Sequence, residues 1–94
     1  MAQLTWHILQ PNDKPQWLAV LERNLTATVR PMNLTPDPQN WRHLKAYIDS
    51  NIQSSRDRGL IRAEKIETRQ VTDEGVTAIH LFRNNVVMAV FKWE

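Results

Sequence analysis

The chain has 94 residues, no cysteine and a formal net charge of +2. This length suits a single domain over residues 1–94, and the lack of cysteine excludes disulfides, cysteine-ligated zinc and thiol chemistry. The first ten residues have neither a basic start nor a long apolar run. We therefore expect no signal peptide, no membrane association and a cytoplasmic protein.

The first two predicted elements are a strand and a helix. Residues 4–10 largely alternate apolar and polar side chains, which is typical of a short strand. A helix is expected over residues 14–25, because Asp13 and Pro15 resemble a capped helix start and Trp17 begins an apolar stripe at helical spacing.

A second helix is predicted over residues 38–55, and its pattern is the clearest in the chain. Asp37 followed by proline is typical of a helix N-terminus. Apolar residues then recur at helical spacing from Trp41 to Ile52. Gly59 is the expected residue just beyond the helix, because glycine adopts the left-handed conformation without steric cost.

The last third of the chain predicts three strands in an antiparallel meander. They cover residues 62–71, 76–83 and 86–93, with a turn at residues 72–75 between the first two. The turn between the last two consists of two asparagines, residues 84–85, which tolerate the positive φ angles that a type I′ turn requires.

The predicted fold is α+β with the element order β-α-α-β-β-β. It combines the C-terminal three-stranded meander with an N-terminal strand, and both helices cover one sheet face. A regular two-residue turn would pair Leu81 with Met88 and Ile79 with Val90. The position of the N-terminal strand in the sheet stays open.

Both faces of the last hairpin are largely apolar, so something is expected to cover each of them. If the helices cover one face, the other becomes a candidate interface. Its predicted residues are Ile79, Leu81, Val86, Met88 and Val90. The covering partner is a second copy in a sheet-on-sheet homodimer, another protein, or the chain itself through the N-terminal strand and residues 31–38. The resulting hypothesis is a small non-catalytic interaction module of the accessory or inhibitor type.

Nucleic-acid binding is the alternative hypothesis. It would use basic residues of the second helix and the following strand, because cationic side chains supply phosphate contacts. These residues are Arg42, Lys45, Arg56, Arg58, Arg62, Lys65 and Arg69. Acidic residues are interleaved with them, and Lys45 and Asp49 have the spacing of a helical ion pair. A winged-helix arrangement would place the second helix in the major groove and residues 72–75 as the wing.

No pattern in the sequence predicts catalysis. The chain contains two glycines, too few for a phosphate-binding loop, and its three histidines have no second ligand at helical spacing: His7, His43 and His80. Asp37 is better explained as a helix cap than as part of a nuclease site, because Glu64 and Lys65 are adjacent and would point to opposite faces of a strand. We expect no enzymatic activity, no cofactor and no metal.

Four tryptophans are expected in the core, since each lies on the apolar side of its element: Trp6, Trp17, Trp41 and Trp93. Chain ends usually fray. A tryptophan as close to the C-terminus as Trp93 therefore predicts that this end packs against the core.

Overall fold

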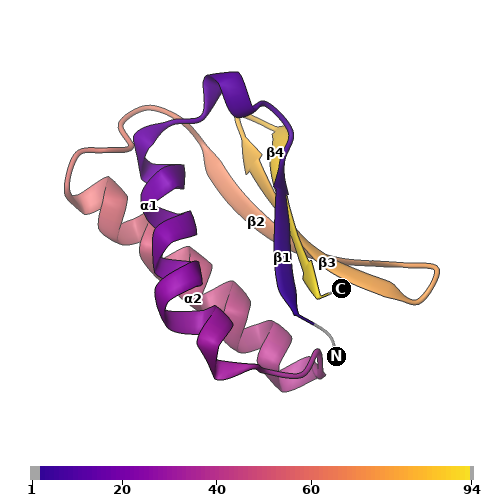
Figure 1. The fold of residues 1–94 in the computed structure, drawn as a ribbon. Coiled ribbons are helices and arrows are strands. Elements are labelled where there is room, and N and C mark those ends of the chain that lie inside the picture. The colour runs from indigo at the N-terminus through magenta and orange to yellow at the C-terminus, as the bar shows by residue number, and fades with distance from the viewer. Residues whose placement is uncertain (1–2, 94) are drawn as a thin grey trace.

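The structure is a computed structural model that describes residues 3–93. Its chain forms two layers, a four-stranded antiparallel sheet and two helices on one of its faces (Figure 1). The strands are β1 (Leu4–Ile8), β2 (Ile66–Asp73), β3 (Val76–Arg83) and β4 (Val86–Trp93). The helices are α1 (Gln16–Asn24) and α2 (Pro38–Asp57). The predicted α+β fold and element order are confirmed.

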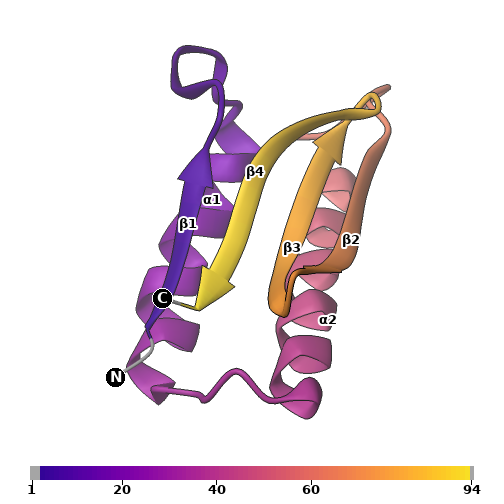
Figure 2. The same cartoon turned by 90° about the vertical axis from the view of Figure 1, so that its right-hand side faces the viewer.

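The N-terminal strand lies at an edge of the sheet, next to the C-terminal strand. The strand order is β1-β4-β3-β2, and all neighbours are antiparallel. Leu4 lies opposite Trp93 and Ile8 opposite Ala89, and Figure 2 shows β1 and β4 side by side. The sheet therefore joins the two ends of the described chain.

The first helical segment starts later and continues further than the sequence predicts. Pro15, not Asp13, is the N-cap of α1. Asp13 lies in a short 3-10 turn, where its Oδ2 is 2.6 Å from Nη2 of Arg83. Beyond α1 the chain continues through a π-helical segment, Leu25–Val29, and a 3-10 turn, Arg30–Met32. Buried apolar residues in the π-helical segment favour this helical extension, although its β-branched residues have lower helix propensity.

The predicted ends of α2 are confirmed at both caps. The Oδ1 atom of Asp37 accepts a hydrogen bond from the backbone N–H of Asn40 at 2.9 Å. This bond is the main reason that the pKa of Asp37 lies below its ordinary value. Gly59 follows the helix with φ of 79°. None of the helices in residues 3–93 combines the length and apolar character needed to cross a membrane.

The core fills the space between the helices and the sheet. The helices contribute Trp17, Leu18, Leu21, Trp41, Leu44, Ile48 and Ile52. The sheet contributes Leu4, Ile79, Leu81, Met88, Ala89 and Phe91. Trp93 packs edge-to-face on Trp41, with 4.6 Å between ring centroids. The prediction that the C-terminal tryptophan packs against the core is confirmed.

A β-bulge changes the register of the last hairpin. Phe82 pairs with Val87 as a two-residue turn requires, but Leu81 pairs with Ala89, so Met88 is the extra residue. The predicted pairs of Leu81 with Met88 and of Ile79 with Val90 are therefore wrong. Beyond the bulge each residue of β4 has exchanged faces relative to β3, because side chains alternate along a strand.

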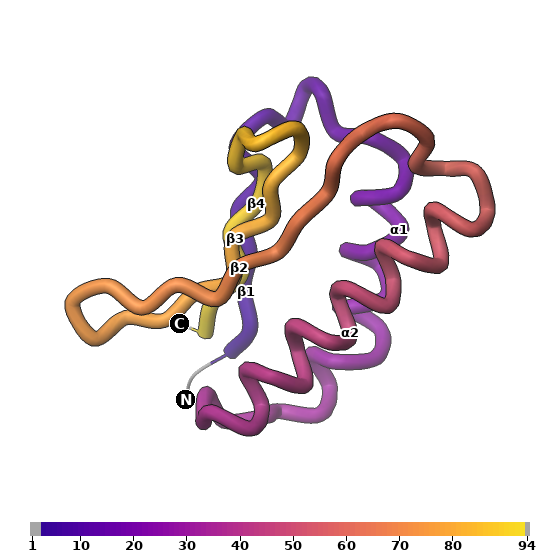
Figure 3. The backbone as a smooth tube through the Cα atoms, turned by 180° about the vertical axis from the view of Figure 1, so that it is seen from behind, coloured from indigo at the N-terminus to yellow at the C-terminus, as the bar shows by residue number. Residues whose placement is uncertain are grey.

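The β2–β3 hairpin extends beyond the rest of the sheet. Figure 3 shows its turn projecting from the body of the molecule. The registers explain this shape, because β3 pairs with β4 only as far as Ile79, whereas β2 and β3 stay paired to Asp73 and Val76. The end of this hairpin is therefore only two strands wide.

Candidate protein-interaction surface

No element within residues 3–93 covers the sheet face opposite the helices, which we name the open face (Figures 1 and 3). The registers place on it six apolar residues: Val71, Val76, Ala78, Phe82, Val87 and Val90. They also place on it a polar rim, formed by Thr5, His7, Glu67, Arg69, Asp73, His80 and Lys92. Most of these apolar side chains are only partly buried. The open face is thus an apolar patch with a polar rim.

Phe82 lies at the centre of a cluster of polar and charged groups. The guanidinium carbon of Arg69 is 5.0 Å from the centre of the Phe82 ring, and the His80 ring centroid is 6.3 Å away. Glu67 lies 3.3 Å from both Lys65 and Arg69. Hydrogen bonding from Lys65 is the main cause that lowers the pKa of Glu67. The carboxylate of Glu67 is therefore shared between two cations.

The structure does not bring the five predicted interface residues together on one surface. Ile79 and Leu81 are fully buried beneath the helices, and Met88 is only 2% exposed. Val86 is 56% exposed at the β3–β4 turn. Val90 lies on the open face, where it pairs with His7 and His80. The helices pack on the side of β3 that carries Ile79 and Leu81. The bulge accounts for Val90, because beyond it Val90 pairs with His80 on the opposite face.

The seven predicted nucleic-acid-binding residues divide into two groups. Four make contacts within the chain: Lys45 with Asp49, Lys65 and Arg69 with Glu67, and Arg56 with the carbonyl oxygens of Arg62 and Glu64. The other three, Arg42, Arg58 and Arg62, are exposed. Ion pairing within the chain therefore occupies several of the cations expected to contact phosphate.

A groove of about 500 Å³ separates α2 from β2. Ile52 and Ile66 are its apolar residues, and both pack with the core. Its charged lining has both signs, with Lys45, Arg56 and Arg69 beside Asp49 and Glu67. Thr68 closes one part of the groove by donating a hydrogen bond to Asp49. The sequence predicted several of these residues for phosphate binding, but not that they line a groove between α2 and β2.

A second, more apolar pocket of about 190 Å³ lies where the first helical segment meets the start of α2. Its lining includes Val29, Met32, Leu34, Leu44 and Tyr47. Met32 is 60% exposed. The sequence pattern gave no indication of this pocket, because Met32 and Leu34 lie in a segment that reads as a proline-rich loop.

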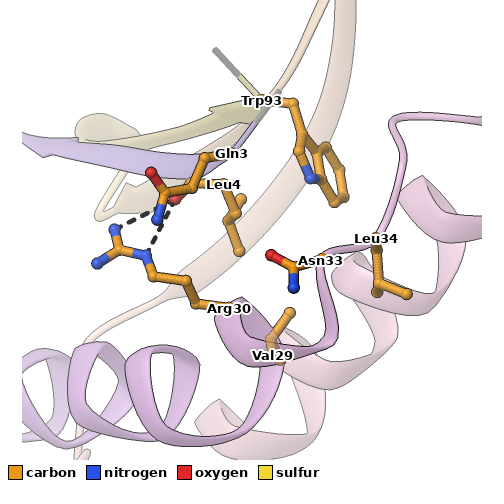
Figure 4. Close-up of a pocket in the computed structure, with 7 residues that line it drawn as sticks. All are labelled: Gln3, Leu4, Val29, Arg30, Asn33, Leu34 and Trp93. Carbon is orange, nitrogen blue, oxygen red and sulfur yellow. Dashed lines mark hydrogen bonds between the residues drawn. The ribbon is translucent and has the colours of Figure 1, made fainter. Parts of the chain in front are cut away.

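Arg30 holds the edge of β1 (Figure 4). Its Nε and Nη2 atoms donate to the carbonyl oxygen of Leu4 at 3.4 and 3.2 Å. Its guanidinium carbon lies 4.7 Å from the ring centre of Trp6. The cavity beside this contact is small, about 10 Å³, so we interpret it as a packing defect around a structural contact.

Within residues 3–93, no group of three or more histidine, aspartate or glutamate side chains is arranged to hold a metal ion. His80 lies on the open face together with His7, and His43 lies beside the pocket at the start of α2. The fold and these surfaces define a two-layer α+β domain. Comparisons with protein-family models, curated proteins and solved structures gave no match.

Proposed function

We propose that this protein is a small interaction module that binds another protein through its open face. The observation that carries the proposal is the uncovered apolar group around Phe82, Val87 and Val90. Apolar patches with polar rims are typical of protein interfaces.

The proposed role is non-catalytic, as an accessory or inhibitor-type protein that occupies a surface of a larger assembly. This class rests on analogy with other small domains. The cysteine-free sequence supports a reducing compartment such as the cytoplasm as the place where it acts.

The decisive experiment compares two variants that each introduce one carboxylate. Val90→Glu changes the open face, whereas Ala46→Glu changes an exposed position on α2. Proteins captured from a lysate by the unmodified chain and by Ala46→Glu, but lost with Val90→Glu, would support the proposal. Capture of the same proteins by all three chains would contradict it. Circular dichroism establishes that each variant is folded.

The cations along the α2–β2 groove and the end of α2 support nucleic-acid binding as a second candidate function. We would test this function by fluorescence anisotropy at low and at physiological salt, with labelled duplex and single-stranded DNA and RNA. Affinity that falls steeply with salt would indicate several phosphate contacts. Arg58→Glu combined with Arg62→Glu is the suitable variant, because both side chains are exposed. Arg56 is unsuitable, since it holds the backbone after α2.

A further inference from the structure

The outer edge of β2 is available for hydrogen bonding. The carbonyl oxygen of Lys65 accepts from the N–H of Asn84 at 2.8 Å, so the backbone of residue 65 points toward β3. Backbone groups alternate in direction along an antiparallel strand. The N–H and C=O groups of Ile66, Thr68, Gln70 and Thr72 therefore point away from the sheet.

The two edges of the sheet differ in a way that singles out β2. The same alternation turns the backbone of Leu4 outward on β1, because Leu9 donates to β4 at 2.9 Å. Arg30 occupies that outward carbonyl group, as Figure 4 shows. No side chain within residues 3–93 caps the outward backbone groups of β2 in this way.

β2 also lacks most of the features that prevent edge strands from pairing. Such edges are normally short, bulged, proline-containing or protected by charged side chains. The charged residues of β2 all lie on its open-face side, at Glu67, Arg69 and Asp73. β2 has eight residues, pairs with β3 in eight consecutive positions, and contains no proline. Its side chains on the helix side are uncharged: Ile66, Thr68 and Gln70. The α2–β2 groove leaves space beside this edge.

We infer that the β2 edge binds a second copy of this chain, with the two β2 strands antiparallel about a twofold axis at Thr68. This register places Glu67 of each copy opposite Arg69 of the other, so the strand is complementary to itself in charge. Ile66 then lies opposite Gln70 on the helix side. The axis runs perpendicular to the sheet, so the helices of both copies lie on the same side.

Registers with the axis further along β2 are less favourable. An axis at Arg69 would bring two arginines together, and an axis at Gln70 would oppose Glu67 and Asp73. An axis at Val71 would pair Arg69 with Asp73, but it would move the contact away from the α2–β2 groove onto the projecting end of the hairpin. The axis at Thr68 combines opposite charges with contact along the groove.

This pairing stops at two copies. It consumes the β2 edge of each chain and leaves only the β1 edges at the ends of the joined sheet. Each of those edges is only five residues long, and Arg30 occupies its outward carbonyl oxygen at Leu4. The assembly is therefore a closed dimer and not an extending fibre.

The first test compares two substitutions at Thr68 by light scattering coupled to size exclusion. The unmodified chain is expected at twice its 11.0 kDa mass. Thr68→Pro removes an outward N–H and leaves the β2–β3 hydrogen bonds in place. Edge strands tolerate proline at such a position, so this variant is expected to be a folded monomer. Thr68→Ala removes the side-chain contact with Asp49 but keeps the N–H, and is expected to stay dimeric. An unmodified chain that stays monomeric at high concentration overturns the inference, as does a dimeric Thr68→Pro.

The second test fixes the register by exchanging charges. Glu67→Arg and Arg69→Glu each create two like-charge contacts and are expected to raise the dimer dissociation constant roughly tenfold. The double variant Glu67→Arg with Arg69→Glu is expected to restore it, whereas Asp73→Lys is expected to have no effect. A double variant as weak as the single ones, or an equal effect of Asp73→Lys, rules out the axis at Thr68.

The inference does not rest on the proposed function. Val90→Glu alters the open face and is expected to leave the mass at that of the dimer, because Val90 lies two strands away from the β2 edge. Loss of the dimer in that variant would contradict pairing through β2. The two proposals can therefore fail independently of one another.

Discussion

At the residue scale, Trp93 shows how one side chain fixes an end of the chain. It lies opposite Leu4 and packs on Trp41 of α2, so it connects three segments that are distant in sequence. Aromatic pairs in an edge-to-face arrangement contribute beyond the area that they bury. The pairing of β1 with β4 therefore depends in part on this ring.

We expect Trp93→Ala to lower the free energy of unfolding by about 2 kcal/mol, below the ~3–5 kcal/mol typical of fully buried aromatic residues, because Trp93 is partly exposed. Urea denaturation followed by circular dichroism measures this change. Trp93→Phe keeps a ring at the site and should lose less. A stability unchanged by Trp93→Ala would show that the terminus contributes little to the fold.

The cap of α2 gives a prediction about acid stability. The pKa of Asp37 is lowered in the folded chain, mainly by the hydrogen bond from Asn40. The carboxylate therefore stabilises the fold fully above its unfolded-state pKa, and this contribution disappears as the pH falls through the lower folded-state pKa. We expect Asp37→Ala to lower the melting temperature at pH 7 and to make little difference in strong acid. Thermal melts across this pH range check the trend, and a constant difference between the two chains would contradict it.

At this scale the sequence predicted features that depend on neighbouring residues, but not contacts between residues that are distant in sequence. Asp37 and Gly59 could be assigned from their neighbours because caps depend on a few adjacent residues. The contacts of Asp13 with Arg83 and of Arg30 with Leu4 join positions far apart in sequence. No sequence spacing encodes such contacts, since they arise only once the strand order is set.

At the element scale, the bulge at Met88 decides which side chains are buried. The asparagine turn was predicted correctly in its positive φ angles, 52° and 67°. A turn of this type fixes only the nearest pairs, Arg83 with Val86 and Phe82 with Val87. One inserted residue then exchanges the faces of everything that follows. The expected interface failed for two reasons: the helices cover the side of β3 that carries Ile79 and Leu81, and the bulge places Val90 on the other face.

Two glutamate substitutions distinguish the bulged register from the regular one. In the regular register Met88 and Val90 share a face, whereas in the structure Met88 is buried and Val90 lies on the open face. We expect Met88→Glu to destabilise the chain by more than about 3 kcal/mol, because a carboxylate would be buried without a partner. Val90→Glu should change stability by less than about 1 kcal/mol. Chemical denaturation of both variants provides the measurement, and similar losses in the two would favour the regular hairpin.

At the scale of the whole molecule, the sheet has one protected and one unprotected edge. The sequence predicted the meander and the two helices because each produces a local periodicity. It did not predict that β1 would join β4. Strand order depends on which sheet edges remain after the meander forms and on how the apolar faces of the helices pack against the sheet. Placing β1 beside β4 leaves β2 as the second edge, and this placement makes the proposed dimer possible.

The dimer makes a further prediction about stability. If only folded chains pair through β2, mass action favours the folded state as the protein concentration rises. Each tenfold increase in protein concentration adds about 1.4 kcal/mol per dimer to the free energy of unfolding. The melting temperature of the unmodified chain should therefore rise by several degrees. Thr68→Pro should melt at one temperature at all concentrations. Calorimetry over a hundredfold range (about 2.8 kcal/mol per dimer) is sufficient to detect the difference. A melting temperature of the unmodified chain that is independent of concentration would show that folding and pairing are not coupled, and would contradict pairing of the β2 edge with a second copy.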